Sequence, residues 1–158
     1  MRIGHGYDVH AFADGRALIL GGVPVNHTRG LAGHSDADVV THAIIDALLG
    51  AASLPDIGQQ FSDSDPQYEN IDSLILLKKT GELIAMAGYA VGNIDATIVA
   101  QQPRLAAYIQ PMRSALATAL GIPCDNINVK ATTEEGLGFT GGNLGIAAHA
   151  VCILVHNR

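Results

Sequence analysis

Apolar and polar residues alternate along several short stretches of this chain, and a period of two is typical of β-strands. The alternation is clearest over 89–100, where Ile94, Ala96 and Ile98 are interleaved with Asp95 and Thr97. Short apolar runs bounded by Gly, Pro and Asn indicate further strands. We expect these strands over 1–10, 17–20, 23–25, 126–131 and 146–155.

Three longer stretches repeat their apolar residues every three to four positions, which predicts helices over 36–54, 72–87 and 109–121. Ser35 stands three residues before Asp38, a pattern close to a capping box, so we expect the first helix to begin directly after Ser35. The segments 26–33 and 55–70 are rich in turn-forming residues and are predicted to be loops.

The resulting order of elements, β-β-α-α-β-α-β-β, predicts one α/β (α+β) domain over residues 1–158, with a mixed β-sheet and helices packed on one face. The run 147–155 is almost continuously apolar, so we expect that strand to be buried on both faces. If helices cover only one face of the sheet, the other face needs a partner. Oligomerisation through the sheet is therefore a hypothesis from the pattern alone.

Composition supports a folded domain, because 48% of the 158 residues are hydrophobic and only 15% are charged. The formal net charge of −6 argues against nucleic acid as a main partner. The two cysteines, Cys124 and Cys152, form neither a zinc pattern nor a disulfide framework. With no apolar run long enough for a membrane span and no signal-peptide pattern, we expect a cytoplasmic protein without a membrane partner.

The motif Asp8-Val9-His10 places two metal-binding side chains on the same face of a strand. His42 in the first helix is the best candidate for a third ligand, and such a set leaves one coordination position open, as in catalytic zinc sites. Asp38 or Asp46, one turn away, could accept the second ring N–H of His42. On spacing alone, the alternative is a surface strand with no metal.

Three further stretches carry groups suited to a phosphate or sugar. Residues 33–36 stand where the first helix is predicted to begin, and free N–H groups at a helix start favour an anion. The acidic stretches 56–58 and 61–65 could hold hydroxyl groups, although on sequence alone a solvated turn is the stronger explanation. Lys130 to Glu135 combine a cation, hydroxyls and carboxylates, which suit phosphates and a bridging Mg²⁺. The chain has neither a P-loop nor a Rossmann fingerprint.

Together these motifs resemble the 2-C-methyl-D-erythritol 2,4-cyclodiphosphate synthases over effectively the whole chain, from residue 1 to about 155. The stretches that carry the resemblance are long and occur in the family's order. They are RIGHGYDVHAF, GLAGHSDADVVTHAIIDALLGAA, PDIGQQFSDSDP, GNIDATIVAQQPRL and NVKATTEEGLGFTG.

The resemblance implies a role for each matching position. Asp8, His10 and His42 match zinc ligands, and Glu135 matches the ligand of a Mg²⁺ or Mn²⁺ that bridges the substrate's diphosphate. His34 and Thr133 match residues that stabilise the transition state. The substrate-binding positions are implied to be Asp8, His10, His34, Ser35, Asp56, Ile57, Gly58, Phe61, Asp63, Asp65, Ala100, Gln101, Pro103, Arg104, Leu105, Ala106, Thr132, Thr133, Glu135 and Phe139.

The resemblance also implies a phosphorus–oxygen lyase of the non-mevalonate isoprenoid pathway, which forms a cyclic diphosphate and releases CMP from a cytidine diphosphate ester. The family is a homotrimer, with sites between subunits and its sheets toward the centre. Two alternatives are a zinc-dependent phosphohydrolase and a non-catalytic trimeric nucleotide-binding protein.

Three positions depart from the family pattern. Gly142 stands where many relatives carry Arg, and Leu144 replaces an acidic residue, so the family's proposed isoprenoid-diphosphate binding in the central channel is not expected here. Ser62 replaces a frequent Pro and is expected to loosen its loop.

Overall fold

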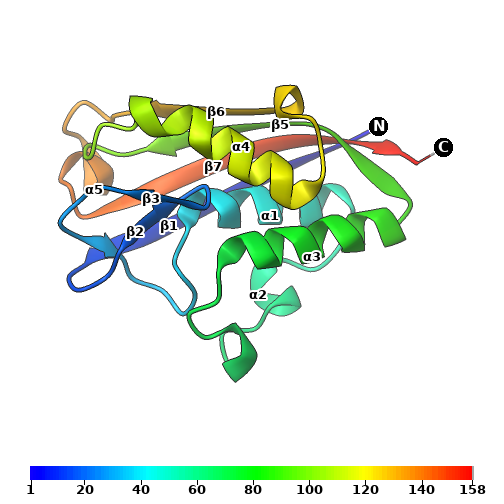
Figure 1. Ribbon diagram of the computed structural model, residues 1–158, viewed down its shortest axis with the longest axis horizontal. Helices are drawn as coiled ribbons and strands as arrows, with labels where there is room; N and C mark the ends of the chain where they lie inside the picture. The colour runs from blue at the N-terminus through cyan, green and yellow to red at the C-terminus, as the bar shows by residue number, and fades with distance from the viewer. Residues whose placement is uncertain (158) are drawn as a thin grey trace.

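The computed structural model describes residues 1–157 and forms a single α/β domain with helices layered against one face of a β-sheet (Figure 1). Its strands are β1 (Arg2–Ala13), β2 (Leu18–Leu20), β3 (Val23–Val25), β4 (Gly30–Leu31), β5 (Tyr89–Val99), β6 (Ile127–Thr132) and β7 (Gly145–His156). Its α-helices are α1 (Val39–Ala51), α2 (Ile57–Gln60), α3 (Ser73–Met86), α4 (Ile109–Leu120) and α5 (Gly138–Gly141). Short 3₁₀ turns lie at Pro66–Tyr68, Ala106–Tyr108 and Cys124–Asn126.

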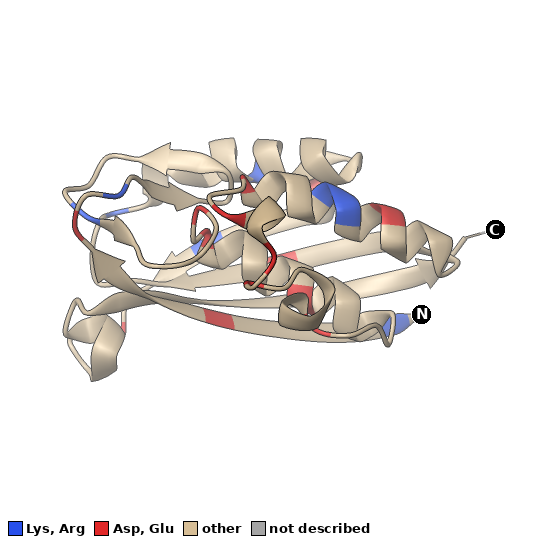
Figure 2. Ribbon diagram, turned by 90° about the horizontal axis from the view of Figure 1, so that it is seen from below, with Lys and Arg blue, Asp and Glu red and all other residues tan. Residues whose placement is uncertain are grey.

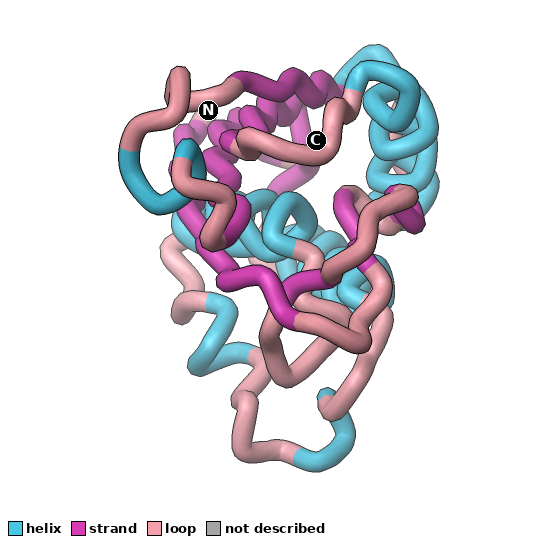
Figure 3. Tube along the Cα trace, turned by 90° about the vertical axis from the view of Figure 1, so that its left-hand side faces the viewer, coloured by secondary structure: helices cyan, strands magenta, loops and turns pink. Residues whose placement is uncertain are grey.

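The main sheet is mixed, as the sequence predicts. Its five strands lie in the order β4-β1-β7-β5-β6, in which only β5 and β6 run parallel, while β2 and β3 form a separate hairpin. Arg2 pairs with Leu154, so the two ends of the chain lie side by side at one end of the sheet (Figures 1 and 3).

Helices α1, α3 and α4 cover one face of the sheet, and Figure 2 shows them on the same side of the strands. Helix α1 lies across β1 and β7, and its side chains are almost all buried. The core forms between these layers and includes Leu20, Ile44, Leu48, Leu77 and Ile98. This part of the sequence-based prediction is confirmed.

The start of α1 differs from the prediction. The helix begins at Val39 rather than Asp36, and its N-cap is Asp38 rather than Ser35. The buried Asp38 carboxylate accepts hydrogen bonds from Thr41 and from the backbone N–H groups of Gly21 and Gly22 in the turn between β2 and β3. Asp38 therefore ties the hairpin to the helix, a long-range role that local capping patterns do not reveal.

Strand β7 is also more exposed than predicted. Its residues Ala148, Ala150 and Cys152 are buried against the helices, whereas His149 and Val151 point to the other face and are exposed. Within one chain the strand is therefore covered on one face only, and burial of its second face by a partner stays a prediction. Burial raises the pKa of the Cys152 thiol to about 11, and both cysteines are unpaired.

The predicted loops contain short elements that their turn-rich sequences concealed. Strand β4 lies within 26–33 and pairs with the end of β1, and 55–70 contains α2 and a 3₁₀ turn. This segment projects from the helical layer, away from the sheet (Figures 1 and 3). Among residues 1–157, no helix is long and apolar enough to cross a membrane.

Candidate functional site

Three predicted metal ligands meet where β1 passes under α1. The Oδ2 atom of Asp8 lies 2.9 Å from Nε2 of His10 and 3.2 Å from Nδ1 of His42, and the two ring nitrogens are 3.2 Å apart. Val9, between the first two ligands in sequence, faces the opposite side of the sheet. The same-face prediction for Asp8 and His10 is therefore confirmed, and α1 supplies the third donor.

These separations fit a bound divalent ion. Donor atoms held about 2.0–2.2 Å from a tetrahedral zinc lie roughly 3.3–3.6 Å from one another, slightly farther apart than the 2.9–3.2 Å seen here. The three donor atoms all lie within 4.8 Å of each other, and their side chains are only partly buried. One carboxylate and two imidazoles thus form a three-donor metal cluster with a side left open to the neighbouring pocket.

Electrostatics couple the members of this cluster. Burial raises the Asp8 pKa, but the hydrogen bonds and charges of His10 and His42 outweigh this effect and hold the pKa at about 2. For His10, burial lowers the pKa, yet its hydrogen bond to Asp8 and the Asp8 charge raise it overall. Asp8 is therefore ionised at neutral pH, and a proton competes with a metal for His10.

The outward-facing nitrogen of His42 has partners other than those predicted. Its Nε2 atom lies 2.8 Å from the hydroxyl of Ser73 and 3.2 Å from that of Ser35. Asp38 is engaged with the hairpin and Thr41, while Asp46 accepts from the backbone N–H of Ile57. Neither carboxylate contacts His42, so that prediction is wrong.

Ser73 was not predicted as a site residue. It begins α3, and its hydroxyl donates to Asp36, which also accepts the Ser73 backbone N–H. The Asp36 carboxylate thereby fixes the hydroxyl that faces His42. No local pattern marks Ser73, because α1 and α3 come together only in the folded chain.

A pocket of about 190 Å³ opens beside the metal cluster. Besides Asp8, His10 and His42, the predicted site residues that line it are Gly33, His34, Ser35, Ile57, Gly58, Phe61 and Asp63. Tyr68 and Leu76 also line it and were not predicted. The Nε2 atom of His34 is buried and has no hydrogen-bond partner within residues 1–157.

Two acidic residues expected near this pocket have structural roles instead of lining it. Asp56 is the N-cap of α2 and accepts from the backbone N–H of Gln59. Asp65 caps the following 3₁₀ turn in the same way, through Gln67. Figure 2 shows the acidic residues in red, and of those in this loop segment only Asp63 lines the pocket, where its carboxylate adds to that of Asp8.

A second pocket, of about 480 Å³, lies beyond the carboxyl ends of β5 and β6. It brings together the predicted residues Ala100, Gln101, Pro103, Arg104, Leu105, Ala106, Thr132 and Thr133, along with Ile109 and Ala131. Glu135 and Phe139 follow in the next loop and in α5, and neither lines either pocket. Glu135 is exposed and adopts a left-handed backbone conformation, with φ of 54°.

The two pockets lie at different strands of the sheet, one beside β1 and the other beyond the ends of β5 and β6. Asp8 pairs with Ala148, which pairs with Ile98, which in turn pairs with Ala131. Neighbouring strands are about 4.8 Å apart, so three steps separate the metal cluster from the second pocket by roughly 14 Å. A single chain therefore presents the two groups of predicted residues as separate half-sites.

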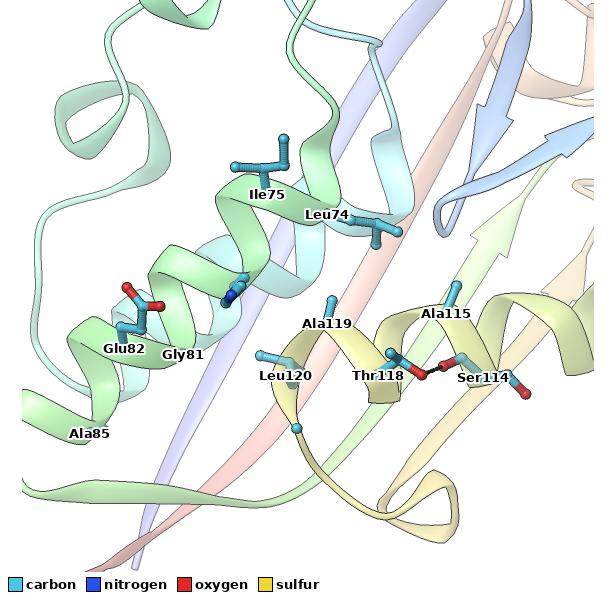
Figure 4. Close-up of a pocket in the computed structure, with 12 residues that line it drawn as sticks. Leu74, Ile75, Gly81, Glu82, Ala85, Ser114, Ala115, Thr118, Ala119 and Leu120 are labelled. Atoms are coloured by element: carbon cyan, nitrogen blue, oxygen red, sulfur yellow. Dashed lines mark hydrogen bonds between the residues drawn. The ribbon is translucent and has the colours of Figure 1, made fainter.

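A groove of about 920 Å³ lies between α3 and α4 (Figure 4). Small and apolar residues such as Gly81, Ala85 and Ala115 line most of it, with Lys78 and Glu82 as its only charged residues. It contains no histidine, cysteine or other cluster of metal donors. We therefore place the chemistry at the smaller pocket beside Asp8.

Comparison with known proteins identifies relatives of the whole chain. Residues 1–155 match the model of the YgbB family. The chain is 59% identical to the 2-C-methyl-D-erythritol 2,4-cyclodiphosphate synthase of Trichlorobacter lovleyi, over 98% of this chain and 99% of that protein.

Two solved structures extend the comparison. The bifunctional IspDF of Campylobacter jejuni superimposes with a TM-score of 0.96 at 41% identity, and the match covers 99% of this chain but only 42% of that protein. IspF of Plasmodium falciparum, solved as a CDP complex, superimposes with a TM-score of 0.86 at 33% identity, covering 99% of this chain and 97% of that one. With the family match, these likenesses show that the chain belongs to the YgbB family of 2-C-methyl-D-erythritol 2,4-cyclodiphosphate synthases.

Proposed function

We infer that this chain converts 4-diphosphocytidyl-2-C-methyl-D-erythritol 2-phosphate into 2-C-methyl-D-erythritol 2,4-cyclodiphosphate and CMP. It is thus a phosphorus–oxygen lyase of the non-mevalonate isoprenoid pathway. The observation that carries this inference is the cluster of Asp8, His10 and His42 beside a polar pocket, in a chain 59% identical to such a synthase.

The reaction is intramolecular. An oxygen of the substrate's own 2-phosphate attacks the β-phosphorus, and the bond from that phosphorus to the oxygen it shares with the CMP phosphate breaks. CMP leaves with the electron pair, and the ring closes. Because nucleophile and electrophile belong to one molecule, the protein mainly has to fold the substrate and neutralise its charge. A phosphate oxygen is already anionic, so no general base is required.

We propose that the cluster holds zinc. Two imidazole nitrogens and one carboxylate oxygen with an open fourth position are a zinc donor set, and the mutual separations of 2.9–3.2 Å fit it. When bound, zinc supplies Lewis-acid polarisation of a phosphoryl oxygen. Asp8 contributes a permanent negative charge, while Ser73 and Ser35 hold the His42 ring with Nδ1 toward the cluster.

A second divalent ion, Mg²⁺ or Mn²⁺, is proposed at Glu135. Its carboxylate is exposed at the turn beyond β6, and hard oxygen donors suit these ions. The backbone N–H of Glu135 donates to the hydroxyl of Thr133, and the next N–H, of Gly136, donates to Gln101. These contacts connect the Glu135 turn to the second pocket, where the leaving nucleotide would lie.

The pockets divide the substrate between them. We propose that the methylerythritol and its phosphate occupy the pocket beside Asp8, with His34, Ser35, Ile57, Gly58, Phe61 and Asp63 around them and with Asp56 and Asp65 shaping the loop. The unpartnered Nε2 of His34 supports a contact to a phosphate oxygen, and Thr133 would provide a second such contact.

Cytidine is assigned to the second pocket, lined by residues 100–106 and by Thr132 and Thr133, with Phe139 beyond it. The CDP complex of the Plasmodium falciparum relative supports a nucleotide site in this fold. The backbone groups of such a loop can recognise a base edge without a basic patch, which is consistent with the net charge of −6.

We further propose a homotrimer whose open sheet faces point to the centre. Ile3, Tyr7, Val9, Val151 and Val155 leave between 41% and 68% of their surface exposed on this one face, an apolar patch typical of an interface. An assembly would also allow the second pocket of one copy to complete the metal pocket of another. The separation of the half-sites in one chain supports this arrangement.

The direct test is product analysis. Purified protein is incubated with the cytidine diphosphate substrate and Mg²⁺, and the products are identified by mass spectrometry. We expect CMP and the cyclic diphosphate in equal amounts. Inorganic phosphate without a cyclic product would instead indicate a zinc phosphohydrolase. Unchanged substrate would indicate a nucleotide-binding protein without turnover.

A further inference from the structure

Two histidines meet on the open face of the sheet, apart from the cluster described above. The Nε2 atom of His5 on β1 and the Nδ1 atom of His149 on β7 lie 3.3 Å apart, within hydrogen-bond distance when one ring carries the proton between them. Side chains alternate between the two faces along a strand. The neighbours Gly4, Gly6, Ala148 and Ala150 are buried on the helical face, so His5 and His149 point to the opposite face. The sheet itself therefore separates this pair from Asp8, His10 and His42.

The spacing of the two nitrogens is that of two ligands on one metal ion. Two nitrogens about 2.05 Å from a tetrahedral ion are roughly 3.3 Å apart. The corresponding distance between His10 and His42 in the proposed zinc cluster is 3.2 Å. We propose that His5 and His149 form a second metal clamp, which takes Zn²⁺ or another divalent ion that binds imidazole.

The surroundings hold the clamp in place. Tyr7 lies opposite His149 in the strand register, and its ring packs on that imidazole at a centroid distance of 4.8 Å. Both histidines stand on hydrogen-bonded neighbouring strands, so little backbone freedom is lost when a metal binds. A preorganised pair binds an ion more tightly than two mobile side chains do.

The charged residues on this face are also compatible with a metal ion between His5 and His149. Asp95, which pairs with Val151 across β5 and β7, bonds to Lys130 at 2.5 Å, so its carboxylate is occupied and the lysine charge is neutralised. Arg2, at the start of β1, turns toward the carbonyl of Ala51 at the end of α1. These contacts engage both Lys130 and Arg2 away from the imidazole pair.

In the trimer proposed above, the pair faces the centre of the assembly. Each clamp offers two donors and leaves the other coordination positions to water or to the same clamp of neighbouring copies. The metal site itself needs only this chain, and the sharing of an ion between copies is the one point that rests on the proposed assembly.

The test is zinc stoichiometry by equilibrium dialysis and elemental analysis on the full-length protein. The unmodified chain is expected to bind zinc beyond the equivalent held by the Asp8 cluster. His5→Gln and His149→Gln should each lose only this additional zinc and still release CMP at the original rate. His156→Gln removes an exposed histidine that packs on Tyr89 rather than on another imidazole, and it should bind as much zinc as the unmodified chain.

Two outcomes would overturn the clamp. One is equal zinc content in the unmodified chain and in both His5→Gln and His149→Gln. The other is an equal loss in His156→Gln, which would show nonspecific binding to surface histidines. Because CMP release is measured on the same samples, a failure of the clamp is distinguishable from a failure of the proposed synthase activity.

Discussion

At the scale of single residues, a hydroxyl decides how the third metal ligand is presented. His42 faces Asp8 with Nδ1 because Ser73 engages its Nε2 at 2.8 Å, and Asp36 in turn fixes the Ser73 hydroxyl. Groups that hold the far nitrogen of a ligand histidine typically affect metal affinity 10–100-fold. Ser73 is thus a positioning residue for the cluster, although it does not touch the metal position.

Ser73→Ala tests this role. Losing the hydroxyl frees the His42 ring, so we expect zinc affinity to fall about 10-fold or more. Competition with a chromophoric chelator measures the change. Thr80→Val is the matched control, because Thr80 is a buried hydroxyl residue on the same helix that donates to the carbonyl of Leu76, away from the metal. Equal zinc affinities in the two variants would refute the role of Ser73.

The raised pKa of His10 predicts opposite effects of pH on the two forms of the protein. Without metal, protonated His10 stabilises the native state through Asp8, and this stability is lost as pH rises through the raised pKa. With zinc, His10 must be neutral, so acidification through the same range releases the ion.

Unfolding by urea between about pH 8 and pH 5.5, with zinc or with a chelator, measures both forms across the range in which histidines titrate. The difference in unfolding free energy between the zinc-loaded and metal-free forms should shrink as pH falls. A difference that stays constant over this range would contradict the coupling of His10 to the metal.

At the scale of elements, the cluster depends on how closely α1 lies on β1. A Cβ atom on Gly6 would overlap the carbonyl oxygen of Ala43, and one on Gly4 would overlap that of Ala47. The helix therefore rests directly on the backbone of the strand. This contact sets the height of His42 above Asp8 and His10.

Gly6→Ala should force the two elements apart. We expect the free energy of unfolding to fall by about 2–3 kcal/mol and the zinc to be lost or weakened. Gly50→Ala, also at the α1 layer, meets no atom within 4 Å and should be neutral or stabilising by up to about 1 kcal/mol. Chemical denaturation with metal analysis compares them. If Gly6→Ala were as stable as Gly50→Ala and kept its zinc, the close approach would not be essential.

The elements also show what sequence reasoning can and cannot reach. Periodicity located the long helices and strands within a few residues, and the Asp8-Val9-His10 spacing gave two ligands on one face. Contacts between distant segments were missed. The sequence pattern placed Asp38 on a helix face beside His42, but its carboxylate binds the turn between β2 and β3. No sequence pattern indicated that Ser73 contacts His42. Such roles depend on tertiary packing, which local patterns do not encode.

At the scale of the whole molecule, the sheet face that no helix covers is the main surface that we expect a partner to bury. Val151 is 44% exposed in its centre, and we expect it to be buried between copies. Val151→Lys would place charges at the proposed trimer centre and should yield monomers. Because the half-sites lie roughly 14 Å apart in one chain, CMP release should fall at least about 10-fold with the assembly.

Ile75→Lys is the control, since Ile75 is equally exposed, at 48%, but lies on α3 outside the sheet. Light scattering should show three chains per particle for this control and for the unmodified protein. A Val151→Lys variant that remains a fully active trimer would remove the sheet face from the interface.

The metal position is the claim on which the chemistry depends, and anomalous X-ray scattering from crystals of the active protein tests it most directly. At the zinc absorption edge, we predict a peak about 2.0–2.2 Å from Oδ2 of Asp8, Nε2 of His10 and Nδ1 of His42. Active protein with no anomalous peak between these three side chains would contradict the account.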